Sequence, residues 1–285
     1  MDPAHRAEAE AAVDRLLPRC GVAVARHTLD GPSGRIHYLE AGGGPPVVLL
    51  HGGFGGAGNW YRTLGPLSRR YRVLAPDRPG YGLSAGGAEA GTAWLDAWLD
   101  ALAVERVALV GHAAGGALAL AYAQARPGRV RALALGDLLL AEGATPAVAP
   151  GAPAGRRWAR RVQTWYSGVA ARFDDRRLLA PEYLYYLWCL AQLRPDQDQR
   201  PPGDATPGPV PIPAAGARTW PAAPILLIWG RGNRWTGVPL ARQLHARIPD
   251  AWLRVIEHSK GIPQLEQPGE YNYAVMTFLE RLTHE

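Results

Sequence analysis

The chain has 285 residues, of which 47% are hydrophobic and 20% charged, and its formal net charge at pH 7 is +6. This composition is typical of a folded globular protein and excludes a disordered chain, a collagen-like repeat and a disulfide scaffold, since there are only two cysteines. The basic residues are scattered, and the densest group, in residues 156–161, is interpreted as a solvated helix face. We therefore expect neither a nucleic-acid nor a membrane partner.

The N-terminal segment, residues 1–19, predicts an amphipathic helix and not a targeting signal. It has neither the basic-then-apolar order of a secretory signal nor an apolar run of membrane-spanning length. Cys20 and Cys189 lie far apart in the sequence and are interpreted as reduced thiols, which favours a cytoplasmic location. The expected apolar side of the helix consists of Ala9, Ala12, Val13, Leu16 and Leu17.

Strand and helix patterns alternate along most of the chain. An opening strand pair is expected at Val22–Thr28 and Arg35–Glu40, with a turn at residues 31–34. Such alternation predicts an α/β fold with a mostly parallel central sheet and helices on both faces. Further strands are predicted at Val47–Leu50, Val73–Ala75, Val107–Val110, Ala132–Leu135, Ile225–Trp229 and Leu253–Ile256, and helices at Ala93–Leu102, Ala117–Ala125 and Pro239–Arg247.

Counting the opening pair, a long insertion separates the sixth predicted strand, Ala132–Leu135, from the seventh, Ile225–Trp229. Residues 1–137 and 221–285 are expected to form the core, and residues 138–220 a lid with a proline-rich arm. Helical patterns are predicted at residues 156–172 and 181–193. Their aromatic residues more often pack than line a ligand site, yet some must face the pocket if the lid covers it. The candidates are Trp165, Tyr166, Tyr183 and Tyr186.

Five different motifs occur one after another along the chain, each in or next to a predicted strand. They are His-Gly-Gly-Phe-Gly-Gly at 51–56, Asp-Arg-Pro-Gly-Tyr-Gly-Leu-Ser at 77–84, Gly-His-Ala-Ala-Gly-Gly at 111–116, the strand and Trp-Gly at 224–230, and Pro-Gln-Leu-Glu-Gln-Pro at 263–268. Together they resemble the α/β-hydrolase superfamily, in the lidded form that carries an HGG-type oxyanion loop. The resemblance implies the α/β-hydrolase fold, with the ligand beyond the carboxyl ends of the strands.

The motif at 111–116 resembles a nucleophile elbow, but its middle residue is Ala113 where the family carries serine. The same resemblance places Asn233 at the position of the acid and Gly261 at the position of the histidine. An asparagine can orient an imidazole but cannot stabilise its positive charge. A laboratory Ser→Ala change explains one of these differences and not three. We therefore favour a natural protein that kept the pocket and gave up the triad.

Several groups around the elbow are candidates for a remaining site. The resemblance implies that backbone N–H groups of Gly53 or Phe54 and of Ala114 form an oxyanion hole, which stabilises charge on a carbonyl without a nucleophile. The side chain of His112 is expected to pack beneath the elbow. Asp137 follows a strand and is a candidate carboxylate, with a capping role about equally supported. Lys260 is a second candidate, although an exposed loop lysine is the commoner case.

No cluster has metal-ligand spacing and no phosphate loop occurs, so neither a metal nor a cofactor is expected. The first functional hypothesis is a cofactor-independent, non-hydrolytic enzyme, such as a cyclase, cycloaddition catalyst, isomerase or lyase of bacterial secondary metabolism, acting on an apolar or polycyclic carbonyl compound. One alternative is a binding protein or receptor for a small molecule. The other is a weak hydrolase with relocated catalytic residues. The sequence is compatible with a monomer or a homodimer.

Overall fold

The computed structural model describes most of the expected core and part of the insertion. None of its described helices combines the length and apolar character needed to cross a membrane. The predicted helix at 156–172, with Trp165, Tyr166 and the basic group, lies outside the described residues, as does Phe54. The described residues are 2–53, 55–87, 91–138, 140–141, 173–193, 210–211, 220–234 and 236–282.

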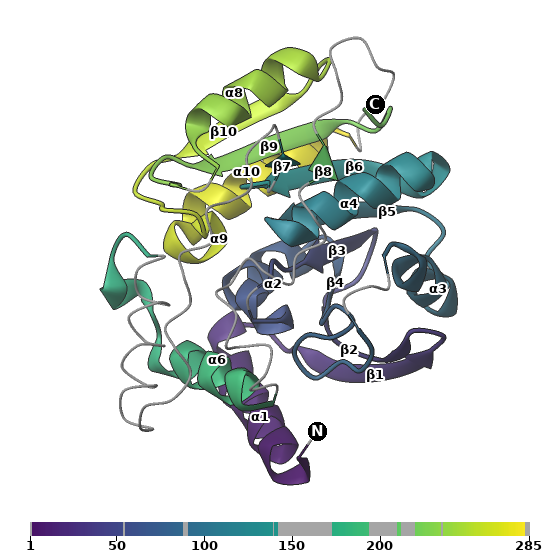
Figure 1. The fold of residues 1–285 in the computed structure, drawn as a ribbon, viewed down its shortest axis with the longest axis vertical. Coiled ribbons are helices and arrows are strands. Elements are labelled where there is room, and N and C mark those ends of the chain that lie inside the picture. Colours follow the sequence, from purple (N-terminus) through teal and green to yellow (C-terminus); the bar gives the residue numbers. More distant parts are fainter. Residues whose placement is uncertain are drawn as a thin grey trace.

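A mostly parallel, eight-stranded sheet forms the centre of the molecule (Figure 1). Its strands are β1 (Ala25–Gly31), β2 (Gly34–Ala41), β3 (Pro46–Leu50), β4 (Arg72–Pro76), β5 (Val107–His112), β6 (Val130–Gly136), β9 (Ile225–Gly230) and β10 (Trp252–Ile256). Their spatial order is β1-β2-β4-β3-β5-β6-β9-β10. The antiparallel pairs are β1 with β2 and β2 with β4, and all other neighbours are parallel. The predicted α/β fold is confirmed.

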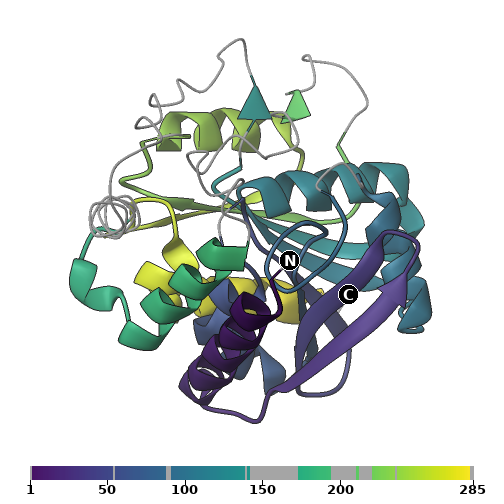
Figure 2. The ribbon, with the colours of Figure 1, turned by 60° about the horizontal axis from the view of Figure 1, so that its bottom comes forward.

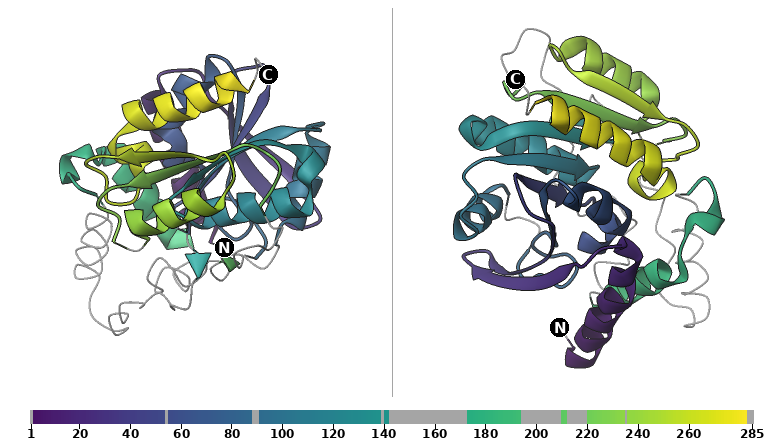
Figure 3. Two further views of the ribbon diagram at one scale, coloured as in Figure 1. Left: turned by 90° about the horizontal axis from the view of Figure 1, so that it is seen from above. Right: turned by 180° about the vertical axis from the view of Figure 1, so that it is seen from behind.

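Helices cover both faces of this sheet, as Figure 3 shows from two further directions. They are α1 (Pro3–Leu16), α2 (Tyr61–Ser68), α3 (Ala93–Ala101), α4 (Ala114–Ala125), α6 (Pro181–Leu193), α8 (Val238–Arg247), α9 (Pro263–Glu266) and α10 (Pro268–Arg281). Short 3-10 turns occur at η1 (Leu17–Cys20), η2 (Ala57–Trp60), η4 (Pro127–Arg129) and η5 (Arg176–Leu178), and a two-residue pair joins β7 (Leu140–Ala141) to β8 (Val210–Pro211).

The buried apolar side chains form two clusters, one on each face of the sheet. Val47 and Leu49 of β3 belong to the cluster that contains α2 and α10. Val48 and Leu50 of the same strand belong to the cluster that contains α3, α4 and α8. Because side chains alternate across a strand, an unbroken apolar run is what a strand buried on both faces requires. The two layers hold the carboxyl ends of β3, β5, β6 and β9 side by side.

The N-terminal helix α1 packs against α6, the described helix of the insertion (Figures 1 and 2). Its buried residues are Ala9, Ala12, Val13 and Leu16, which confirms most of the predicted apolar side. From α6, Tyr183 and Tyr186 are both 1% exposed. The Tyr183 hydroxyl donates to Asn59 Oδ1 at 3.1 Å, and the Gly58 N–H donates to the Tyr186 hydroxyl at 3.1 Å. Thus α6 supports the segment that follows the HGG loop.

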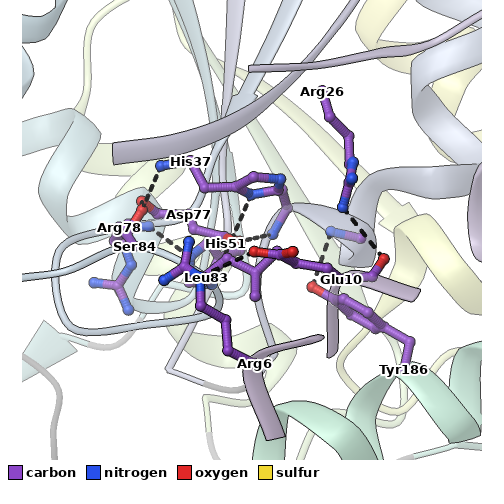
Figure 4. A network of polar contacts seen from close by, with 12 residues as sticks. Arg6, Glu10, Arg26, His37, His51, Asp77, Arg78, Leu83, Ser84 and Tyr186 are labelled. Atoms are coloured by element: carbon purple, nitrogen blue, oxygen red, sulfur yellow. Dashed lines mark hydrogen bonds and ion pairs between the residues drawn. The ribbon is translucent and has the colours of Figure 1, made fainter. Parts of the chain in front are cut away.

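A buried aspartate ties this same segment to the turn after β4 (Figure 4). Asp77 Oδ1 accepts the N–H of Ala57 at 2.6 Å, and Oδ2 accepts the N–H of Leu83 at 2.9 Å and contacts His37 Nδ1 at 2.8 Å. Gly82 has φ 51°, and a Cβ there would collide with the carboxylate. The motif at 77–84 therefore encodes a charged anchor for two loops.

We expect Asp77→Asn to lower the free energy of unfolding by about 2–4 kcal/mol. Three buried donors now share the two carboxylate oxygens of Asp77, whereas an asparagine amide offers only one acceptor oxygen. Urea unfolding followed by circular dichroism measures the change. The matched control is Asp30→Asn, whose side chain is 79% exposed and should contribute within about 0.5 kcal/mol. Equal effects of the two changes would show that the Asp77 network does not anchor the loops.

Candidate active site

The connection between β5 and α4 has the backbone geometry of a nucleophile elbow. Ala113 has φ 50° and ψ −115°, a conformation that non-glycine residues rarely adopt and that costs about 1–3 kcal/mol. Its N–H donates to Gly136 O at 2.8 Å, and its carbonyl accepts the Ala117 N–H at 3.0 Å. The structure thus holds the methyl group of Ala113 in the place where an elbow presents its nucleophile.

Glycines allow the start of α4 to approach the sheet closely. A Cβ on Gly115 would collide with the carbonyl oxygen of Leu50, at the end of β3. A Cβ on Gly116 would lie 2.7 Å from a methyl carbon of Leu138. The residues Gly115 and Gly116 are therefore required for the turn even though no serine stands in it. The close approach also places the first turn of α4 beside the HGG loop.

Ala113 is partly exposed, whereas its neighbours His112 and Ala114 are buried. As the first residue of α4, Ala114 has an N–H with no partner inside the helix, and a helix N-terminus favours negative charge. Gly53 is also partly exposed. The elbow therefore places the methyl group of Ala113 next to an N–H donor that has no partner within α4. Such an arrangement can bind a carbonyl oxygen on which negative charge develops.

His51 supports the HGG loop. Its Nδ1 lies 2.7 Å from the carbonyl oxygen of Gly52, and its Nε2 accepts the backbone N–H of Arg78 at 3.0 Å. Burial lowers the pKa of His51 to about 3, so its ring is neutral at pH 7. Its two nitrogens are both occupied, and it has no free group for catalysis.

Asn233 and Asp137 meet at the carboxyl ends of β6 and β9. Asn233 Nδ2 donates to Asp137 Oδ1 at 2.7 Å and to Thr236 Oγ1 at 3.2 Å, while its Oδ1 accepts the Thr236 N–H at 3.0 Å. Asp137 Oδ1 also accepts the N–H of Gly230 at 3.1 Å. The amide of Asn233 thus orients a neighbouring carboxylate instead of an imidazole.

The second oxygen of Asp137 is buried and has no hydrogen-bond partner among the described residues. Asp137 is 2% exposed and has φ 44°, a backbone region that is uncommon for non-glycine residues but more frequent for aspartate than for most. Burial raises the pKa of Asp137 to about 7, although the Asn233 and Gly230 donors act in the opposite direction. Its carboxyl group can therefore exchange a proton near neutral pH. Both suggested roles, a loop cap and a carboxylate at the site, are compatible with these contacts.

The ring of His112 lies between the HGG loop and the segment after β10. Its Nε2 is 2.7 Å from Gly261 O and 3.8 Å from Asp137 Oδ2. A Cβ added to Gly52 would lie 3.3 Å from Nδ1 and 3.4 Å from the Ala113 methyl. Burial lowers the pKa of His112 to about 4, so the ring is neutral. Because Nε2 must carry the proton that it donates to Gly261 O, Nδ1 is the acceptor, on the side of the elbow.

The loop that carries Gly261 is organised by Glu266, which is 1% exposed. Glu266 Oε2 accepts the Ser259 hydroxyl at 2.6 Å and the Lys260 N–H at 2.9 Å. Gly261 has φ 144°, which disfavours a side chain at this position. The glutamate of the motif at 263–268 therefore holds the loop in which Gly261 stands.

Lys260 reaches toward the insertion. Its Nζ lies 3.5 Å from Phe173 O and 3.6 Å from Asp174 Oδ1. In the described part of the chain, this ammonium group makes no hydrogen bond or ion pair with Asp137 or His112. Asp137 therefore lies next to His112 and Asn233, whereas the side chain of Lys260 contacts residues 173–174.

From the sequence, His112 is expected only to pack beneath the elbow, and no local pattern connects it with Asp137. The two residues are 25 positions apart, and their side chains meet because β5 and β6 are parallel neighbours, with His112 paired to Gly136 in register. Among sequence-based signals, only the predicted parallel pairing of these two strands could have indicated that His112 and Asp137 lie close together. Within the described residues, no group of three or more His, Cys, Asp or Glu side chains is arranged to hold a metal ion.

The raised pKa of Asp137 makes the free energy of unfolding depend on pH. The carboxyl binds its proton more tightly in the folded chain, so its contribution is complete below about pH 4 and is lost as pH rises through about 7. Asp137→Asn keeps an acceptor for Asn233 and Gly230 and does not titrate. Relative to this variant, we expect the native protein to lose up to about 1.4 kcal/mol per pH unit between pH 4 and 7. Urea unfolding of both proteins across this range measures the difference, and parallel pH profiles would contradict it.

Comparisons with known proteins agree with the fold. The sequence profile of a family described as "alpha/beta hydrolase fold" matches residues 45–268. The 2-hydroxy-6-oxo-6-phenylhexa-2,4-dienoate hydrolase of Comamonas testosteroni is 30% identical over 270 residues, covering 86% of this chain and 91% of that protein. A 2-hydroxy-6-oxononadienedioate/2-hydroxy-6-oxononatrienedioate hydrolase 2 of Pseudomonas putida is 28% identical over 269 residues, covering 86% and 92%.

Solved structures show the same architecture. Naproxen esterase (carboxylesterase NP) of Bacillus subtilis superposes with a TM-score of 0.81 at 21% identity, covering 98% of this chain and 99% of that one. These relatives are named as hydrolases or esterases, and their names give no support to a cyclase or to natural-product biosynthesis. The chain belongs to the α/β-hydrolase family.

Proposed function

We propose that this protein is an α/β-hydrolase-family enzyme that has given up the Ser-Asp-His triad and activates a small carbonyl compound without a covalent intermediate. The observation that carries the proposal is Ala113, held in the strained elbow conformation beside the N–H of Ala114, which has no partner within α4. A turn that costs about 1–3 kcal/mol is expected to persist where it serves a site. Asn233 and Gly261 stand where the acid and the histidine are expected, which is consistent with the loss of acyl-enzyme chemistry.

The names of the curated relatives suggest the substrate class. They describe hydrolases of 2-hydroxy-6-oxo dienoates, which carry a ketone, a conjugated chain with an enol, and a carboxylate. A substrate of this class presents a carbonyl oxygen to the Ala114 N–H and an unsaturated chain to the apolar floor at Ala113. We therefore propose a linear unsaturated keto acid, in place of the purely apolar or polycyclic compound expected from the sequence.

Carbon–carbon bond hydrolysis on such a substrate needs two proton movements, and we propose that His112 Nδ1 takes part in both. First, the proton of the 2-hydroxyl moves to C5, which converts the dienol into a ketone and makes C5 a leaving group conjugated with C2. Then a water molecule gives its proton to Nδ1 and its hydroxide to C6, and the carbonyl oxygen becomes an oxyanion beside Ala114. Collapse breaks the C5–C6 bond, and its electron pair moves through the conjugated chain to the oxygen on C2. That oxygen takes the proton from His112, which gives 2-hydroxypenta-2,4-dienoate and benzoate.

Asp137 supports these steps indirectly. Its unpartnered Oδ2 lies 3.8 Å from His112 Nε2, so an ionised carboxylate stabilises the imidazolium that forms when Nδ1 accepts a proton. The expected rate is modest. Oxyanion donors and binding supply about 10³–10⁴-fold, and a general base typically adds about 10²–10⁴-fold.

A second candidate is the first step alone, an isomerisation of the enol to the ketone. The observation that favours it is the pKa of Asp137, raised by burial to about 7, which suits a proton store at neutral pH. This reaction consumes no water and needs no nucleophile. Binding without turnover, as in a receptor, is the third possible outcome of the same experiment.

We expect turnover of 2-hydroxy-6-oxo-6-phenylhexa-2,4-dienoate that depends on the space above Ala113. Ala113→Phe fills that space without entering the sheet core, and should abolish turnover or binding while leaving thermal unfolding unchanged within a few degrees. Ala125→Phe, at the exposed far end of the same helix, is the matched control and should retain full activity. Absorbance of the conjugated dienoate follows turnover, and calorimetry follows binding.

Products formed in H₂¹⁸O separate the candidates. Hydrolysis gives benzoate with one ¹⁸O and 2-hydroxypenta-2,4-dienoate, whereas isomerisation gives a product of unchanged mass. Binding that is lost in Ala113→Phe, with no product, would leave only the receptor. Full function in a folded Ala113→Phe protein would place the ligand away from the elbow and overturn the proposal.

A further inference from the structure

Arg78 is a buried cation at the base of the HGG loop. It follows β4 and is 4% exposed. Its Nη2 donates to the carbonyl oxygen of Gly52 at 2.9 Å, and its guanidinium carbon lies 4.4 Å from the ring centroid of Tyr81. Figure 4 shows Arg78 beside Asp77 and His51 in the network that holds this loop. His51 accepts the backbone N–H of Arg78, so this contact leaves the guanidinium group of Arg78 unoccupied by His51.

The charge of Arg78 has no acidic partner among the described residues. Its Nε is buried there without a hydrogen-bond partner. Asp77 is adjacent in sequence, but its two oxygens are used by His37, Ala57 and Leu83. Burial lowers the pKa of Arg78 and the Tyr81 phenol opposes this, with no carboxylate contributing. An arginine nevertheless stays protonated in proteins, so the group remains a cation.

An unpaired buried charge is costly, and a carbonyl oxygen with an aromatic ring compensates it only in part. Arginine offers a planar fork of N–H donors that matches a carboxylate, and such charge-assisted hydrogen bonds are strong. In Arg78 the fork has donors beyond the one bound to Gly52, including Nε. An anionic ligand group would supply the missing partner.

Gly52 connects this cation to the elbow. Its carbonyl oxygen accepts from Arg78, while the position of its absent side chain faces His112 Nδ1 at 3.3 Å and the Ala113 methyl at 3.4 Å. The guanidinium and the elbow floor are therefore neighbours across a single residue. An anchor at Arg78 requires that a ligand over Ala113 extends past Gly52 toward the guanidinium.

We infer that Arg78 is the anchor for the carboxylate of the substrate, which fixes the keto acid in one orientation with its ketone at Ala114. The inference rests on the proposed function for its substrate class. It makes Arg78 a binding and specificity residue, in addition to its contact with the loop. A purely structural Arg78 would support the loop equally for charged and uncharged ligands.

The test uses a saturated probe, so that its result does not depend on turnover. Calorimetry measures the dissociation constants of 6-oxo-6-phenylhexanoate and of the matching amide, 6-oxo-6-phenylhexanamide, for the full-length protein. We expect the acid to bind about tenfold or more tightly than the amide. Arg78→Gln should remove this preference and leave amide binding nearly unchanged, and Arg78→Lys should retain part of it because it keeps charge without the fork.

Arg70→Gln is the matched control, since Arg70 is 63% exposed and paired with Glu280, and it should retain the full preference. Equal binding of acid and amide to the native protein, or no binding of either, overturns the inference whether or not Arg78→Gln folds. An acid preference that persists in folded Arg78→Gln also overturns it. Acid preference without any turnover would sink the proposed reaction and leave the anchor standing.

Discussion

The backbone of Ala113 is the constraint on which the rest of the site depends. Its positive φ is imposed from two sides, by the hydrogen bond to Gly136 on β6 and by the approach of Gly115 to the carbonyl of Leu50 on β3. These contacts turn the N-terminus of α4 toward the HGG loop and leave the Ala113 methyl partly exposed. The proposed oxyanion site, the position of His112 and the proposed space for a ligand all depend on that turn.

Around the elbow, Asp137 joins two polar side chains. Its Oδ1 accepts from Asn233, and its Oδ2, which has no hydrogen-bond partner among the described residues, lies 3.8 Å from His112 Nε2. Restoring aspartate at position 233 would put two carboxylates where an amide and a carboxylate now lie 2.7 Å apart, so one of them would have to remain protonated. The arrangement is therefore coherent as it stands, with a neutral asparagine beside a carboxyl that titrates near pH 7.

Much of the fold could be predicted from the sequence, because apolar runs, turn residues and glycine motifs are local signals. The opening hairpin, with its turn at 32–33, and the elbow between β5 and α4 are examples. The site could be predicted less well. The pairing of His112 with Gly261 joins residues 149 positions apart, and the direction of Lys260 toward Phe173 depends on where the insertion returns to the core. Such contacts depend on loop register, which no local pattern specifies.

The most direct test of this account is a crystal structure of the protein with 6-oxo-6-phenylhexanoate bound. The account predicts that the ketone oxygen lies within hydrogen-bond distance of the Ala114 N–H, with the adjoining carbons over the methyl group of Ala113. It also predicts that the ligand remains unattached to the protein. A ligand bound elsewhere, with the elbow empty, would contradict the claim that a nucleophile-free elbow is the working site.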